Sequence, residues 1–178
     1  MNVTELTDAY SDDMLYLLDL DKMIESQPGG NATPDFIKYS CCCRLWATMM
    51  VGTFEMVVKS WGQNDVFWRD IMRYLKDGRS DNRSNRDRVD SLQKAIQTRG
   101  LKAQMNDFDD LLAIIYIRNA YVHGKWIPAQ AKYVEARGFP SDLMKFSKDN
   151  FERMKSIYSA VLTPLGASMI ISPTNRRN

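Results

Sequence analysis

The chain has 178 residues, of which 44% are hydrophobic and 26% are charged, with a formal net charge of +2 and a single histidine. These values fit a folded domain and exclude a disordered tail protein, a collagen and a disulfide scaffold. The lone histidine also excludes a metal site built on several histidines. We expect one domain over residues 1–171, followed by a disordered tail over residues 172–178.

The hydrophobic pattern predicts helices along the chain and no convincing strand. A first helix is expected over residues 4–26. A second is expected over residues 34–61, with Thr33 as its N-cap, Pro34 at the first helical position and Gly62 as its stop. Apolar residues occur almost all the way around this second helix, so it should lie at the centre of the fold.

Shorter helices follow, separated by polar or glycine-containing turns. The sequence predicts them over residues 65–77, 87–98, 106–122, 128–135 and 147–162, with the last disturbed at Pro164. A polar, arginine-rich loop is expected over residues 79–86. The fold class predicted is therefore all-α, a bundle of five to seven helices around the second helix and the helix at 106–122.

The three cysteines, Cys41, Cys42 and Cys43, are consecutive. Neighbours on one helix cannot bridge with good disulfide geometry, and an unpaired set is typical of a reducing compartment. The simplest interpretation is that one or two of them are buried as small apolar residues. The sequence shows no secretory signal and no apolar run approaching about 20 residues, so we expect a cytoplasmic protein without a membrane segment.

The small net charge hides an asymmetry between the two parts of the chain. Residues 1–35 carry eight acids and one base, a charge of −7, whereas the remainder carries 23 bases and 14 acids, a charge of +9. A basic body with an acidic arm is compatible with nucleic acid as a partner. Two ordinary solvated faces would give the same numbers, so charge alone does not decide.

The segment that carries chemistry is the end of the helix at 106–122. If Leu111 faces the core, the same face returns at Arg118, so a guanidinium falls on the apolar stripe and needs partners there. Such broken rules concentrate at functional sites. Asn119 and His123 are four apart and share a face, whereas Arg118 and His123 are five apart. Arg118 and His123 should therefore converge only if the last turn loosens before Gly124, or if a second copy approaches.

The segment Arg118-Asn119-x-x-x-His123 resembles the Arg-x(4–6)-His motif of the HEPN superfamily, whose commonest form has a polar residue after the arginine. The resemblance implies an all-α HEPN-like bundle. It also implies a metal-independent endoribonuclease of a toxin–antitoxin or antiphage defence system that acts on RNA as a homodimer without a cofactor. Two motifs would then form one composite site, next to apolar contacts from Tyr121, Trp126 and Ile127.

Roles for the motif follow from the chemistry of RNA, which carries its own nucleophile in the 2′-hydroxyl. We expect His123 to act as general base or acid, because histidine exchanges its proton near neutral pH. We expect Arg118 to stabilise the phosphate in the transition state, because its planar fork matches phosphate oxygens. Asn119 would orient the substrate or His123, and the resemblance implies a 2′,3′-cyclic phosphate product.

Supporting residues are predicted around this motif. Several HEPN subfamilies carry a glutamate in a setting like that of Glu55, which we expect to partner Arg118; an exposed pair with Lys59 is the alternative. Lys125 stands where some HEPN toxins have a tyrosine that accepts adenylyl groups, so this regulation is not expected here and a phosphate contact is. The bases expected to bind RNA are Lys125, Arg79, Arg83 and Arg86.

Two other classes of function stay open at this point. One is a catalytically inactive HEPN-type module that binds RNA or a protein partner, for example an antitoxin or another protein of the same system. The other is an unrelated helical interaction protein in which Arg118 and His123 point apart as ordinary polar residues. The sequence names neither the RNA target nor a regulator.

Overall fold

The computed structural model describes residues 12–13, 15–19, 22, 35–64, 66–75 and 82–170, and these ranges hold helices and no strand. The predicted all-α class is therefore confirmed. Within the expected first helix, over residues 4–26, the described residues are helical. The predicted tail over residues 172–178, the cap Thr33 and the residue Pro34 lie outside the described residues.

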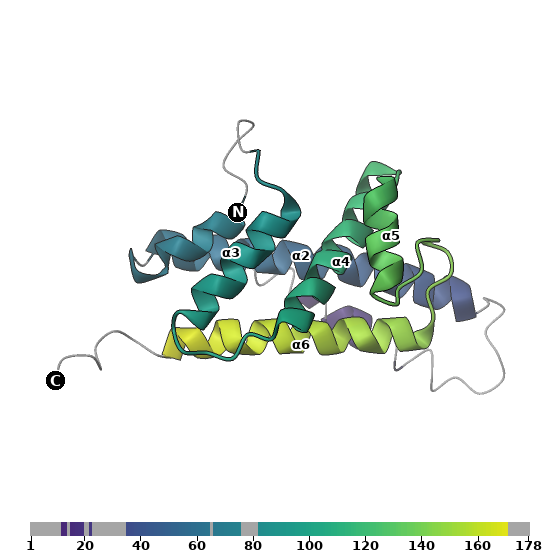
Figure 1. The fold of residues 1–178 in the computed structure, drawn as a ribbon. Helices are drawn as coiled ribbons and strands as arrows, with labels where there is room; N and C mark the ends of the chain where they lie inside the picture. Colours follow the sequence, from purple (N-terminus) through teal and green to yellow (C-terminus); the bar gives the residue numbers. More distant parts are fainter. Residues whose placement is uncertain are drawn as a thin grey trace.

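After these first helical residues, six helical elements with described bounds follow one another along the chain. They are α2 (Asp35–Asn64), the 3₁₀ helix η1 (Val66–Tyr74), α3 (Asn85–Gln97), α4 (Met105–His123), α5 (Pro128–Ala136) and α6 (Lys148–Ile170). The long helices α2 and α6 pack alongside each other, and α4 crosses both (Figure 1). Since α4 also contacts α3 and α5, it is the central connection of the bundle.

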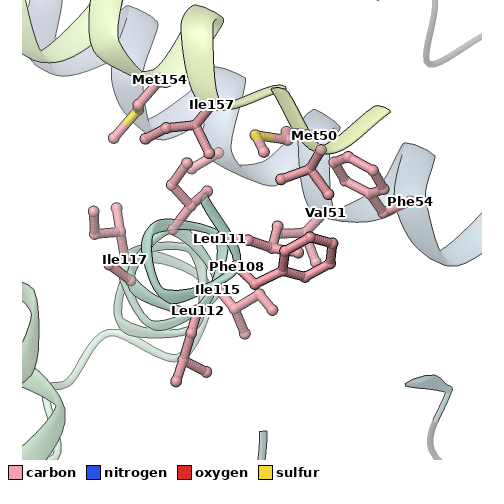
Figure 2. Close-up of a cluster of buried hydrophobic side chains, with 14 of the residues drawn as sticks. Met50, Val51, Phe54, Phe108, Leu111, Leu112, Ile115, Ile117, Met154 and Ile157 are labelled. Atoms are coloured by element: carbon pink, nitrogen blue, oxygen red, sulfur yellow. The ribbon is translucent and has the colours of Figure 1, made fainter. Parts of the chain in front are cut away.

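Helix α4 is buried on most sides because its apolar residues surround it. Leu111, Leu112 and Ile115 are at most 6% exposed, and Phe108 is at 1%. Figure 2 shows these side chains meeting Met50, Val51 and Phe54 from α2, and Met154 and Ile157 from α6. Burial of such side chains contributes roughly 1.5–3 kcal/mol each, so this cluster fixes the orientation of α4 and of the residues at its end.

Several helix boundaries differ from the sequence prediction. Helix α2 continues through Gly62 to Asn64, since a glycine permits a helix stop but does not impose one. The segment predicted as a helix over 65–77 is a 3₁₀ helix where it is described. Helix α3 begins at Asn85 rather than at 87, because Ser84 and Asp87 form a capping box. Helix α6 runs through Pro164.

One helix in the described residues, α2, is long and apolar enough to cross a membrane by length and composition alone. The sequence prediction of no apolar run of that length did not anticipate this. However, 61% of its most apolar window is buried inside the structure, and the core helix of a soluble protein passes the same test. Cytoplasmic localisation therefore stays a prediction.

Candidate functional site

A pocket of about 1350 Å³ opens at the carboxyl end of α4. Four parts of the fold line it: the end of α4 with the following loop, the start of α5, the second half of α2, and the corner between η1 and α3. All three residues of the predicted motif, Arg118, Asn119 and His123, are among its lining residues. The pocket is therefore the place where the predicted chemistry can be examined.

Helix α4 stays regular through His123 and ends at Gly124, whose φ of 67° is left-handed and suits glycine. The loosened last turn, one of the two ways in which Arg118 and His123 could converge, is thus not found. His123 is exposed and Arg118 is half-buried, and both nevertheless line one pocket of a single chain. The Nη1 of Arg118 donates to Asn119 Oδ1 at 3.0 Å, and its buried Nε has no hydrogen-bond partner among the described residues.

Glu55 lines the same pocket, but its ionic partner differs from both alternatives considered from the sequence. Arg88 Nη2 lies 3.6 Å from Glu55 Oε1, and no ion pair with Arg118 or Lys59 occurs among the described residues. Arg88 reaches Glu55 from α3, while its Nε donates to the carbonyl of Tyr74 at 2.6 Å. The expectation that Glu55 partners Arg118 is therefore wrong.

The predicted RNA-binding bases do not all lie together. Lys125 and Arg83 line the pocket, and Arg83 donates to the carbonyls of Arg73 and Leu75 at 2.6 and 3.0 Å. Arg79 lies outside the described residues.

Arg86 lines a different part of the surface. It binds Asp109 and donates to the hydroxyl of Tyr133 at 2.7 Å. Burial opposes its charge, but the hydrogen bonds and charges of Asp109 and Tyr133 together outweigh this and raise the pKa of Arg86. Arg86 therefore does not line the pocket, and its role in RNA binding stays a prediction.

The charge of the pocket is strongly one-sided. Seven lysines and arginines line it against one carboxylate, that of Glu55. The sequence interpretation missed four of these bases: Lys59, Arg69, Arg73 and Arg88. A signal existed for two of them, since Arg69 and Arg73 are four apart in a segment that was itself predicted to be helical.

Tyr74 lies beneath this charged surface, fully buried at 1% exposure. Burial, and next the charge of Glu55, raise the pKa of its hydroxyl, while Arg88 and Arg118 act in the opposite direction. The Arg88 guanidinium lies 5.4 Å from the centre of the ring. The hydroxyl has no hydrogen-bond partner among the described residues. Because its pKa is raised, Tyr74 is a neutral group next to the basic pocket.

No group of three or more histidine, cysteine, aspartate or glutamate residues within the described part of the chain is arranged to hold a metal ion. Cys42 and Cys43 are buried and Cys41 is exposed, as expected for small apolar residues on a core helix. Burial raises the pKa of the Cys43 thiol, which keeps it protonated.

Comparison with known proteins gives no match to a family model, a curated protein or a solved structure. The HEPN resemblance thus rests on residues 118–123 of this chain, together with its helical fold.

Proposed function

We propose that this protein is a metal-independent endoribonuclease of the HEPN type, belonging to a toxin–antitoxin or antiphage defence system. The observation that carries the proposal is that Arg118, Asn119 and His123 line one strongly basic pocket. A cleft lined by charges of one sign concentrates ligands of the opposite sign, and RNA is a polyanion. In an unrelated interaction protein, nothing would require the lone histidine to line the same pocket as seven lysines and arginines.

The proposed reaction uses groups that the pocket offers. His123 removes the proton from a 2′-hydroxyl, whose oxygen then forms a bond to the adjacent phosphorus. Arg118 stabilises the charge that develops on the phosphate oxygens. The bond from phosphorus to the 5′ oxygen breaks, and the leaving oxygen takes up a proton. The products are a 2′,3′-cyclic phosphate and a free 5′-hydroxyl.

We also propose that two copies pair near the end of α4. Tyr121, Val122 and Ile127 are 41%, 51% and 53% exposed and lie beside the motif. Trp126, which was expected to join this contact, is instead partly buried against the core. Light scattering after size separation at micromolar concentration tests the proposal: a dimer is expected, and a strict monomer contradicts the composite site.

The central test is RNA cleavage in the presence of EDTA. Wild-type protein should cut single-stranded RNA, and His123→Ala and Arg118→Ala should each reduce the rate by about 100-fold or more. RNA binding should weaken more for Arg118→Ala, because this variant lacks a guanidinium that binds phosphate. Lys132→Ala serves as the control, because Lys132 is exposed and does not line the pocket.

Three results would contradict the proposed reaction. Identical RNA products from wild type and His123→Ala would remove the role of the histidine. Loss of activity in EDTA would require a metal, and equal cutting of DNA would exclude the 2′-hydroxyl as the nucleophile. Binding of RNA without any cleavage would instead favour the inactive binding module.

A further inference from the structure

The 3₁₀ helix η1 presents different residues to the core and to the pocket. With three residues per turn, positions three apart share a face. Ile71 and Tyr74 form the face in the core, at 0% and 1% exposure. Arg69 and Met72 form the next face and line the pocket. The core contacts of η1 therefore hold Arg69 at the pocket wall.

The acid of η1 and its two pocket-lining bases differ in their partners. Its acid, Asp70, is bound by Arg99 in the turn that follows α3, and Arg99 Nη1 donates to Asp70 Oδ2 at 2.9 Å. Its two pocket-lining bases, Arg69 and Arg73, are exposed and make no ion pair with a carboxylate among the described residues. The one acid that could neutralise this wall from within η1 is thus directed elsewhere.

The remaining bases of the pocket fall into two groups. Arg83 and Arg88 are engaged by backbone carbonyls at the end of η1, and Arg88 also by Glu55. Lys59, on α2, makes no ion pair with a carboxylate within the described part of the chain, like Arg69 and Arg73. Three cations therefore remain on the α2–η1 wall, which is distinct from the wall that carries the motif.

We propose that Arg69, Arg73 and Lys59 form a second phosphate-binding subsite, which holds a phosphate of the RNA strand other than the one that is cut. The inference rests on the proposed function and adds the substrate class: a single strand that spans the pocket from the α4 wall to the η1 wall. A volume of about 1350 Å³ exceeds the 300–1,000 Å³ that suits a drug-sized ligand, which favours a strand over a single nucleotide.

The subsite recognises the backbone rather than the bases. None of the residues that line the pocket is a phenylalanine, tyrosine or tryptophan, so the described wall offers no aromatic ring for a base to stack on. Stacking platforms are the usual route to base contacts with single strands. Guanidinium and ammonium groups bind phosphate whatever the base, so single-stranded DNA should occupy the subsite as well.

The test separates binding from cleavage by using two probes. The first is a fluorescent single-stranded 2′-O-methyl RNA oligomer, which lacks the nucleophile and reports binding alone. The second is a dinucleoside monophosphate, whose single phosphate can occupy only the cleavage position. The variant is Arg69→Ala/Arg73→Ala, and the matched control is Lys94→Ala/Lys102→Ala, which removes the same charge at exposed positions outside the pocket.

The Arg69→Ala/Arg73→Ala variant should bind the oligomer at least about tenfold more weakly. It should also reduce the slope of log affinity against log salt by roughly 0.7 for each phosphate that the variant no longer neutralises. The control should change affinity by less than about twofold, since its positions lie outside the pocket. Cleavage of the dinucleoside should be unchanged, and Arg69→Lys/Arg73→Lys should restore most of the oligomer binding.

Two results would overturn the subsite. Equal reductions of affinity in the variant and in the control would mean that only the net charge of the protein matters, and not the position of the arginines. A loss of dinucleoside cleavage as large as the loss of oligomer binding would place the arginines at the scissile phosphate. If wild type does not cleave the dinucleoside, but Arg69→Ala/Arg73→Ala loses oligomer binding and the control does not, the subsite stands and the proposed nuclease function fails.

Discussion

The two ends of helix α4 differ in whether their charged side chains have partners of opposite charge. Near its amino end, both oxygens of the buried Asp110 are matched: Arg137 Nε donates to Oδ1 at 2.6 Å and Arg153 Nη2 to Oδ2 at 2.8 Å. The preceding Asp109 is bound by Arg86. Both of these carboxylates therefore have a guanidinium within reach.

At the carboxyl end the balance is reversed. Arg118 makes no ion pair with a carboxylate among the described residues, and the pocket that it lines holds seven bases and one acid. Charges that are matched within the protein stabilise the fold, whereas charges of one sign held together repel one another. The comparison assigns a structural role to the amino end, and the unmatched charge at the carboxyl end is what the proposed binding of a polyanion uses.

The largest expected effect is on the matched end. Asp110→Asn keeps the volume of the side chain but leaves Arg137 and Arg153 without their carboxylate. Since removing one partner of a buried ion pair costs about 3–5 kcal/mol, the free energy of unfolding should fall by that amount in a urea titration. The control is Asp90→Ala, which removes an exposed pair with Arg86 and should cost less than about 1 kcal/mol. Equal losses would contradict the structural role of Asp110.

The same measurement on the unmatched end should give a result of opposite sign. Arg118→Met removes a half-buried charge whose Nε has no partner among the described residues, and it keeps an unbranched side chain. We expect unfolding free energy to be unchanged or raised by up to about 1 kcal/mol, since a buried donor without a partner is a cost to the folded state. RNA cleavage should be lost in the same variant. A loss of more than about 2 kcal/mol would assign Arg118 to the structure instead.

The local signals in the sequence predicted much of the fold. The apolar run at 111–117 and Gly124 identified α4 and its end, and the structure has α4 ending at His123. The spacing of four residues likewise predicted that Asn119 and His123 share a face of this helix, and both line the pocket. By contrast, Gly62 was interpreted as a helix stop and Pro164 as a disturbance after residue 162, and both helices continue past these positions in the structure.

The partners of the charged side chains could not be predicted in the same way. Glu55 and Arg88 belong to different helices and meet only because α2, η1 and α3 pack around Tyr74. No periodicity within one helix carries that information. The same holds for Arg86, which counted as a loop base in the sequence but is a helical residue bound to Asp109.

A smaller effect is expected from the ion pair between Glu55 and Arg88 inside the pocket. Glu55→Ala leaves Arg88 with its bonds to the Tyr74 carbonyl and to Asn85 Oδ1, at 2.6 and 3.0 Å. The side chain of Glu55 is 31% exposed and its contact with Arg88 is long, at 3.6 Å. The loss in unfolding free energy should therefore be about 1 kcal/mol, near that of a surface pair. A loss of about 3–5 kcal/mol, as for Asp110, would mean that the pocket depends on this carboxylate for its structure.

The smallest expected effect concerns Asp87. This acid lies two residues after the pocket residue Asn85, but it does not line the pocket. Asp87 accepts hydrogen bonds from the backbone and the hydroxyl of Ser84, at 2.9 and 2.7 Å, and these lower the pKa of its carboxyl. A lowered pKa means that the folded state prefers the ionised form. The contribution of Asp87 to stability is therefore complete above the ordinary pKa of an aspartate and is lost as pH falls through the lower value in the folded protein.

Asp87→Asn should accordingly be less stable than wild type near neutral pH, by less than the Glu55 variant. The difference in urea midpoint should shrink as pH is lowered from about 6 towards about 2. Ser84→Ala provides the matched control, because it removes the main cause of the lowered pKa and should weaken the pH dependence of the Asp87 effect. A difference that stays constant across this range would mean that the carboxylate is not held in the cap and remains available to offset the charge of the pocket.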